Sequence, residues 1–482
     1  MKRSKVPQFC FLLGLGLLLA AGEGRGESEG GDLLLSDEVV PWEELGSDEE
    51  LVRRPALLFE AAAAGFLAGD SPEKRKFKMD GFLEPGPIAP GFETPSGAVA
   101  QPQLVLFGEF RTALQAFDDG QRDVVEWANR LDLYANFNFT ATERILVGFR
   151  PLDRNGEFSG YRSGSGSRDG WEEHLDGEPQ VFFFEGDLGE MFPNWDREDR
   201  RHLDYNLAVG RMPLEFQDGI MIDDSFDAVA LTRSSLFGGG ASALRVAGVF
   251  GFSEIDRGDN RKDSDARLYG VFLAADYEKS TYEADVVYVD GSEERGGDGA
   301  YVGVGQTRRF GRLNATTRAN FSWALDDESA AVGTGVLLFS QLSRTVSHNR
   351  DIMYLDSFWA IDDYTSAARD PAAGGPLGGT GVLFDAVGLG EYGSALGNRA
   401  SGAVGAAVGY QHFLDERNRR QLVTEIGGRA ATRKEGRSAA AIGARYQQAV
   451  GKHSIFVLDG FGAYYDDGDA GFGARCEMRV KF

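Results

Sequence analysis

The chain has 482 residues and a formal net charge of -25, from 50 Lys and Arg against 75 Asp and Glu. A polyanion of this kind is a poor partner for nucleic acid, because the phosphate backbone carries the same sign of charge. The hydrophobic fraction of 42% and the mean hydropathy of -0.29 fit a soluble protein or a membrane β-barrel equally well, since barrel strands alternate lipid-facing and lumen-facing residues.

The N-terminal residues carry an export pattern. Basic residues within the first five positions precede an apolar run, Phe9–Ala21, and small and acidic residues follow it. This order is that of a secretory signal peptide. A membrane anchor is the alternative, but the run has about 13 residues where a spanning helix needs roughly 20. We expect residues 1–26 to be a signal peptide, cleaved after Gly22 or Gly26.

No second apolar run has the length of a membrane-spanning helix. The best internal candidate, Leu57–Gly69, is short and is interrupted by Glu60. The exported chain is therefore either soluble or crosses a membrane as strands. Cleavage of the signal removes Cys10 and leaves Cys476 alone, so we expect no intrachain disulfide.

Residues 27–100 differ from the rest of the chain. Acids dominate Glu27–Glu50, a short helix is plausible over Asp48–Leu67, and a Pro/Gly-rich stretch (GFLEPGPIAPGFETPSG) follows. We interpret this segment as an acidic, Pro/Gly-rich N-terminal extension. Two interpretations stay open: a mostly disordered periplasmic leader with a linker, or a segment that plugs the pore or docks a partner.

From Gln101 onward, apolar and polar residues alternate over long segments. Leu131–Phe139 and Leu313–Trp323 each place one kind of side chain on odd positions and the other on even positions, so each strand has one apolar and one polar face. We count about 18 such segments, and most supply the 9 to 11 residues that a tilted membrane-crossing strand needs. We therefore predict that residues 101–482 form an all-β, transmembrane antiparallel β-barrel of about 16-18 strands.

The connections between these segments alternate in character. Counted back from the C-terminus, short links such as Gly451–His453 alternate with others that include the long Asp362–Arg399. Asp153–Glu178 and Asp256–Asp265 fall on the same side as that long link. Bacterial barrels have short periplasmic turns and longer extracellular loops, so we expect the long links outside. The Gly-, Ala- and Pro-rich 362–399 loop could fold inward as a constriction or form a mobile exterior loop; the sequence leaves both open.

The chain ends in GFGARCEMRVKF, which alternates up to the terminal Phe482. Phe472, Cys476 and Met478 share one face with Phe482, whereas Arg475 and its alternate neighbours form the other. This ending resembles the C-terminal signature by which the assembly machinery recognises outer-membrane barrels. The resemblance implies insertion into the outer membrane of a Gram-negative bacterium, with Cys476 facing lipid.

A second stretch, Val209–Arg233, indicates a strand, a turn at Asp218-Gly219 and a returning strand. Its Gly-Arg, Asp-Gly and Phe-Asp-Ala-Val elements loosely resemble those of alginate-export-like porins. That resemblance implies a Gram-negative outer-membrane β-barrel porin in which Arg211 is a lumen residue near the outer rim.

The alternation, together with the resemblance for Arg211, gives a set of candidate pore-lining residues. A ring of guanidinium groups in a water-filled lumen attracts anions and rejects cations. The alternative is an arginine–carboxylate network that only holds the wall together. The candidates are Arg111, Arg130, Arg144, Arg150, Arg211, Arg318, Arg429, Arg445, Glu109, Asp132, Glu283 and Asp285.

Enzymatic signatures are missing from the sequence. The five histidines are scattered without zinc-ligand spacing, and no phosphate loop, dinucleotide fingerprint or nucleophile elbow is present. We therefore expect a chain that is not an enzyme and that uses no cofactor or metal.

The predicted function is that of an outer-membrane porin, a channel for the diffusion of small hydrophilic solutes, anions among them, because a barrel of this size leaves an aqueous channel. A barrel that sheathes or anchors a partner protein is the alternative, and a soluble secreted β-protein is a third class. Expected partners are outer-membrane lipids, the barrel-assembly machinery through the strand ending in Phe482, and small solutes. A homo-oligomer stays open, and no nucleic acid is expected.

Overall fold

The computed structural model describes residues 91–164, 169–195, 203–292, 295, 297–326, 329, 331–346, 350–434 and 436–482. They all belong to one unit, Glu50–Phe482. The expected signal peptide and most of the expected N-terminal extension lie outside the described residues, and the domain boundaries stay predictions. Within the described ranges, no helix is long and apolar enough to cross a membrane.

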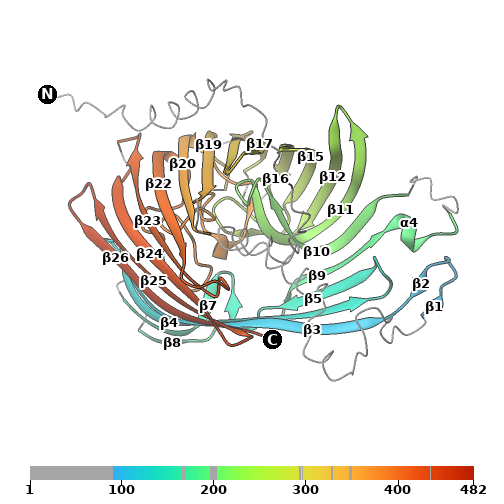
Figure 1. Ribbon diagram of the computed structural model, residues 1–482, viewed down its shortest axis with the longest axis horizontal. Coiled ribbons are helices and arrows are strands. Elements are labelled where there is room, and N and C mark those ends of the chain that lie inside the picture. The colour runs from blue at the N-terminus through green and yellow to red at the C-terminus, as the bar shows by residue number, and fades with distance from the viewer. Residues whose placement is uncertain are drawn as a thin grey trace, which may run out of the picture. The chain divides into compact units, whose positions relative to one another are not determined.

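The described chain forms a closed antiparallel barrel with 18 strand positions (Figure 1). The last strand, β26 (Ala470–Lys481), pairs with the first, β3 (Gln103–Asp118), and this pairing closes the wall. The predicted number of about 16-18 strands is confirmed, with 18 observed. The other full-length strands are β4 (Asp123–Asn138), β10 (Asn206–Phe216), β11 (Ile222–Gly238), β12 (Ala241–Ser253), β15 (Arg267–Tyr277), β16 (Ser280–Asp290), β17 (Gly299–Phe310), β18 (Leu313–Ala324), β19 (Gly335–Thr345), β20 (Ile352–Asp363), β22 (Ser401–Phe413), β23 (Arg420–Ala431), β24 (Ala439–Val450) and β25 (Ser454–Tyr465).

Two strand positions next to β4 are composite. One half of β4 pairs with β5 (Arg144–Phe149) and the other half pairs with β7 (Glu157–Gly164). β5 then pairs with β9 (Pro179–Asp187), and β7 pairs with the short β8 (Gly170–Glu172). This part of the wall is therefore assembled from pieces, whereas β17 and β18 pair continuously along their whole length.

The two faces of the wall are inverted relative to a soluble protein. Large apolar side chains such as Leu106, Leu114 and Val271 are exposed on the outward face. Polar residues on the inward face are buried; in β18 these are Thr316, Arg318, Asn320 and Ser322. The strand alternation predicted for Leu131–Phe139 and Leu313–Trp323 is confirmed. Cys476 is exposed on the outward face of β26, as its shared parity with Phe472 requires.

Most links on one rim are short, with 188–205 as the exception, and the longest link lies on the other rim. The rim that holds the start of β3 and the end of β26 has tight turns such as Gly239-Gly240, where both residues have positive φ, 60° and 80°. Glycine adopts this conformation without a Cβ penalty, and such two-residue turns match the twist of the flanking strands. The opposite rim has the longer links, including 254–266 and 364–400. By the rule for bacterial barrels, the first rim is periplasmic and the second is extracellular.

The longest link, residues 364–400, folds into the barrel. Its β21 (Ala368–Arg369) pairs in parallel with the start of β11, and η3 (Pro371–Ala373) follows. Farther along, Leu377, Leu383 and Leu389 are fully buried against the inner wall. The question that the sequence left open is answered: this inward loop occupies the lumen and is not an exterior loop.

Shorter elements complete the described structure. The hairpin of β13 (Ile255–Asp256) and β14 (Lys262–Asp263) lies in the extracellular link after β12, and β6 (Asp153–Arg154) pairs with β7. On the periplasmic rim, β1 (Phe92–Glu93) pairs with β2 (Val99–Ala100), and α4 (Leu188–Met191) follows β9.

Candidate functional site

Three arginines lie directly opposite one another across three neighbouring strands. Arg130 of β4 is opposite Arg111 of β3, and Arg111 is opposite Arg479 of β26. Directly opposite residues share a face with Cβ atoms about 4.5–5.5 Å apart, so this arginine row concentrates positive charge on the inner wall. Like charges in this arrangement destabilise a sheet unless other groups compensate them.

Buried carboxylates compensate much of that charge. Glu477 lies between Arg111 (Nε to Oε1, 2.6 Å) and Arg479 (Nε to Oε1, 3.0 Å), and its side chain is fully buried. Asp132 accepts from Arg130 at 2.9 Å. The row therefore has three guanidinium groups against two directly bonded carboxylates, with Glu109 buried on the same face of β3.

The inward loop covers the arginine row with backbone carbonyl groups. Arg111 donates from Nη2 to the carbonyl of Val387 at 2.9 Å, and Arg130 donates from Nη1 to that of Gly388 at 3.1 Å. Because carbonyls carry no net charge, they satisfy the guanidinium hydrogen bonds without neutralising the row. Gly388 has φ 63°, which lets the chain turn over the arginines.

Further ion pairs hold the start and the middle of the inward loop. Arg150 bonds both Asp132 and the loop residue Asp370, each at 3.2 Å. Burial alone would raise the pKa of Asp370, but the positive charge of Arg150 and a hydrogen bond from the Ala372 amide outweigh it and hold that pKa below its usual value. In the middle of the loop, Arg445 bonds Asp385 at 3.0 Å.

Carboxylates of the wall also bind the loop backbone. Glu425 of β23 accepts from the amides of Val382 and Leu383, and Glu126 of β4 accepts from that of Glu391. Glu126 is one of several inward acids that our candidate set omitted; others are Glu185, Asp356, Glu425, Asp459 and Glu477. The alternation of inward and outward residues along each strand would have been sufficient to predict that these acids face inward. With these acids included, basic and acidic groups on the inner face are closer to balance than the candidate set suggested.

The remaining inward candidates form separate groups. Arg318 bonds Asp218 (2.7 Å) and Glu283, and Asp285 accepts from Gln217 at 2.5 Å, so these residues hold the 217–221 turn inside the barrel. Arg144 bonds Glu185 at 2.6 Å. Arg429 donates to the carbonyl of Gly397, and Arg445 also bonds Asp459 at 2.8 Å. These positions are inward as expected; their role as pore-lining residues stays a prediction.

Arg211 is the exception, and its predicted position in the lumen is wrong. It is opposite Asp227 in β11, and the same register pairs Val209 with Val229 on the outward face. Met212, the next residue, is the one that points inward, where it is buried among apolar side chains. Arg211 therefore lies on the outward face and bonds Asp227 (3.0 Å) and Glu254 (3.6 Å). The motif resemblance gave the wrong face because it carried no strand register.

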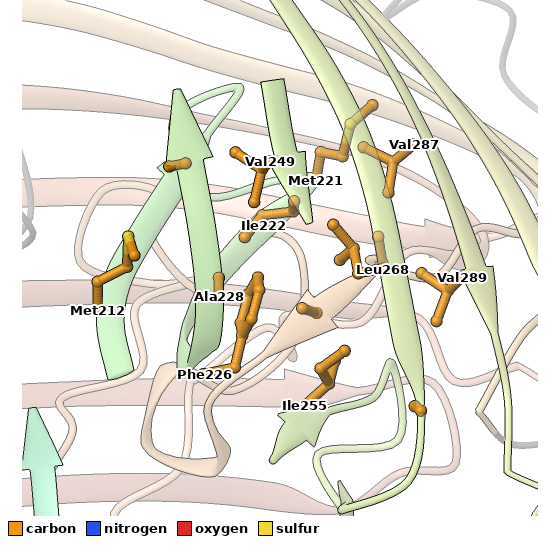
Figure 2. Close-up of a cluster of buried hydrophobic side chains, with 14 of the residues drawn as sticks. Met212, Met221, Ile222, Phe226, Ala228, Val249, Ile255, Leu268, Val287 and Val289 are labelled. Carbon is orange, nitrogen blue, oxygen red and sulfur yellow. The ribbon is translucent and has the colours of Figure 1, made fainter. Parts of the chain in front are cut away.

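A second sector of the lumen is apolar. Met212, Phe226, Leu268, Val287 and their neighbours on β10–β17 point toward one another inside the wall (Figure 2). Met221 of the 217–221 turn and Ala367 of the inward loop belong to the same cluster. We call this cluster the apolar sector, and we call the inner face of β3, β4 and β24–β26 the charged sector.

A closed barrel with an apolar outward face and charged residues inside defines a class, the transmembrane β-barrels of the Gram-negative outer membrane. Among solved structures, the chain is similar to outer membrane protein OpdK from Pseudomonas aeruginosa (TM-score 0.51, 11% identity, covering 79% of this chain and 98% of that one). It is similar to the same extent to OccK2 (OpdF) of that organism (TM-score 0.51, 11% identity, 79% and 98% covered).

No family model matches the sequence, and no curated protein matches it either. At 11% identity, the likeness to the solved structures is one of fold. The resemblance to alginate-export-like porins stays a prediction.

Proposed function

We propose that this protein is an outer-membrane channel through which small hydrophilic solutes diffuse, with a weak preference for anions. Its barrel has the strand number at which porins enclose water, and the inward loop narrows that lumen as a constriction. The similar solved structures are outer-membrane proteins of the same architecture.

The observation that carries the proposal is the arginine row beside the inward loop. Arg130, Arg111 and Arg479 are opposite one another, an arrangement that costs stability. A wall held together only by ion pairs would gain nothing from this row, since alternating charges satisfy a network better. Guanidinium groups covered by neutral carbonyls keep a positive local field, which favours anions in a narrow aqueous path.

The net charge of the chain does not argue against this preference. Many acids belong to the N-terminal extension of the sequence. Others lie in exposed extracellular turns such as 466–469, where water and salt screen them within about 8–10 Å. A permeating ion samples the lumen, where low-dielectric walls focus the field of nearby groups.

Planar-bilayer recording of the purified protein tests the proposal. We expect discrete conductance steps and, in a salt gradient, a reversal potential of the sign that anion preference gives. Clear cation selectivity would refute the anion preference and leave the channel intact. An inserted, heat-modifiable barrel without conductance would refute the channel itself and favour the alternative in which the barrel sheathes or anchors a partner.

A further inference from the structure

The wall of the barrel is split between β9 and β10 on the extracellular side. The two strands pair from Asp187 with Asn206 as far as Phe182 with Arg211. Beyond that pair, β9 continues to Pro179 by pairing with β5, and β10 continues to Phe216 by pairing with β11. Among these residues, all of which the structure describes, no backbone hydrogen bond joins 179–181 to 212–216.

Sequence features at the split explain why the strands separate. Gly210 has φ 124°, and a Cβ there would collide with the carbonyl oxygen of Phe182, so the strands approach closely just before they part. Pro213 lies in the unpaired part of β10 and has no amide hydrogen to donate. Proline is confined to strand edges for that reason, so the unpaired side of β10 behaves as an edge inside a closed barrel.

Arg211 spans the split from the outside. Its Nη1 donates to the carbonyl of Pro179 at 3.2 Å, while Nε and Nη2 hold Asp227 at 3.0 and 3.1 Å. Pro179 lies beyond the last pair of β9 with β10, so this side-chain hydrogen bond joins the two strands where their backbones do not pair. We call Arg211, with its bond to Pro179, the latch. Glu254 contacts Arg211 at 3.6 Å and Lys262 of the β13–β14 hairpin at 2.8 Å.

At the split itself the outward face carries charged groups, Arg211 with Asp227 and the exposed Glu215, and apolar side chains lie next to it on both faces of the wall. Just on the periplasmic side of it, Phe182 (55% exposed) and Val209 (39% exposed) lie on the outward face that meets lipid. Inside, Val181 and Met212 are buried members of the apolar sector, and they would be opposite each other if the ladder continued. At the split, therefore, no backbone pairing of β9 with β10 separates lipid from the apolar interior, whereas β15, β16 and β17 form a hydrogen-bonded wall.

We propose that the split is a lateral gate that admits the hydrocarbon chain of an amphiphile from the outer leaflet into the apolar sector. The occupant is argued from the lining: Val181, Met212 and Phe226 are buried in an apolar cluster behind the split. The same inward face also carries one buried carboxyl group close by, that of Asp224 opposite Leu214. Opening requires breaking the bond from Arg211 to Pro179 and not a β-ladder. This route is separate from the aqueous path and goes beyond the proposed channel function.

The test uses the wild-type protein in vesicles that contain a phospholipid with a diazirine near the end of one acyl chain. After photolysis, mass spectrometry maps the residues that carry adducts. We expect adducts on the inward Met212 at a yield approaching that on the lipid-facing Phe182. Val287 and Val289, inward members of the same cluster behind the intact β16 wall, are the internal control and should stay unlabelled. Labelling of Met212 no greater than that of Val287 would overturn the gate.

Two variants sharpen the test, each checked for folding by heat-modifiable migration. R211Q removes the latch and should raise the adduct yield at Met212. The matched control is R233Q. Arg233 is an outward residue nearer the periplasmic end of β11 and bonds Tyr205, so its replacement should leave the adduct yield at Met212 unchanged. Equal yields in R211Q and wild type would show that Arg211 is no latch, and equal effects of both variants would attribute the labelling to general loosening. The adduct yields do not depend on conductance. The proposed gate and the proposed channel function can therefore be refuted independently of each other.

Discussion

The charged sector and the apolar sector line the same lumen but are stabilised in different ways. In the charged sector, Glu477 and Asp459 each hold two or more arginines, and the inward loop is bound through its backbone. In the apolar sector, Phe226 and Met221 are fully buried among aliphatic side chains, and the loop makes one ion pair with β11, that of Arg369 with Asp223 at 3.7 Å. If the proposed channel function holds, we expect the charged sector to control the permeation of ions and the apolar sector to have little effect on it.

Deleting the part of the inward loop that covers the charged sector should have the largest effect. Replacement of residues 375–398 by a short Gly-Ser linker removes the carbonyls over Arg111 and Arg130 together with Asp385. The strands keep their pairing, so we expect an inserted barrel whose single-channel conductance is several-fold larger. Unchanged conductance would place the aqueous path beside the apolar sector and break the comparison.

Two substitutions should cost similar stability but differ in selectivity. F226A opens a cavity in the apolar sector and should lower the free energy of unfolding by about 3–5 kcal/mol. E477Q leaves buried arginines without their shared carboxylate and should cost about 3–5 kcal/mol. Urea unfolding in vesicles measures both. Only E477Q should strengthen anion preference in the reversal potential; an equal shift in F226A would mean that selectivity arises from the wall as a whole.

Arginine substitutions separate the two sectors more finely. R130S removes a member of the arginine row and should shift the reversal potential toward cations. R318S is the matched control, because Arg318 is 3% exposed and holds the 217–221 turn against the apolar sector. We expect R318S to reduce stability without changing selectivity. The opposite result, a shift with R318S alone, would place the selectivity-determining region at that turn.

The free energy of unfolding should depend on pH through Asp256, which lies in the extracellular link 254–266. Burial, and then the negative charge of Asp370, raise the pKa of Asp256 in the β13–β14 hairpin to about 7. A carboxyl whose pKa is higher in the folded than in the unfolded state stabilises the fold below its unfolded pKa, and this contribution is lost as pH rises through the folded value. The urea midpoint should therefore fall between about pH 4 and pH 7. D256N should flatten that part of the profile; an unaltered slope would assign it to other carboxyls.

The sequence predicted the wall better than its contents. Alternation in Leu313–Trp323 gave the correct faces because a strand in a barrel has a fixed two-residue period. The inward position of the loop was not predictable, since it depends on distant partners such as Arg111 and Glu425 that no local pattern connects. The prediction that Arg211 lies in the lumen was wrong for a related reason. The face on which Arg211 lies depends on the register of β9, β10 and β11, which a short motif does not contain.

The smallest expected effect concerns Cys476 and tests the register on which the charged sector depends. Cys476 is exposed on the outward face of β26, between Arg475 and Glu477, which point inward. A membrane-impermeant maleimide should therefore label it poorly in intact membranes, where lipid covers it, and well after denaturation. Because a one-residue slip exchanges the two faces of a strand, rapid labelling in the intact state would place Arg475 and Glu477 in lipid. Unpaired charges there are costly, so such a result would remove the charged sector from the lumen and reverse the comparison of the two sectors.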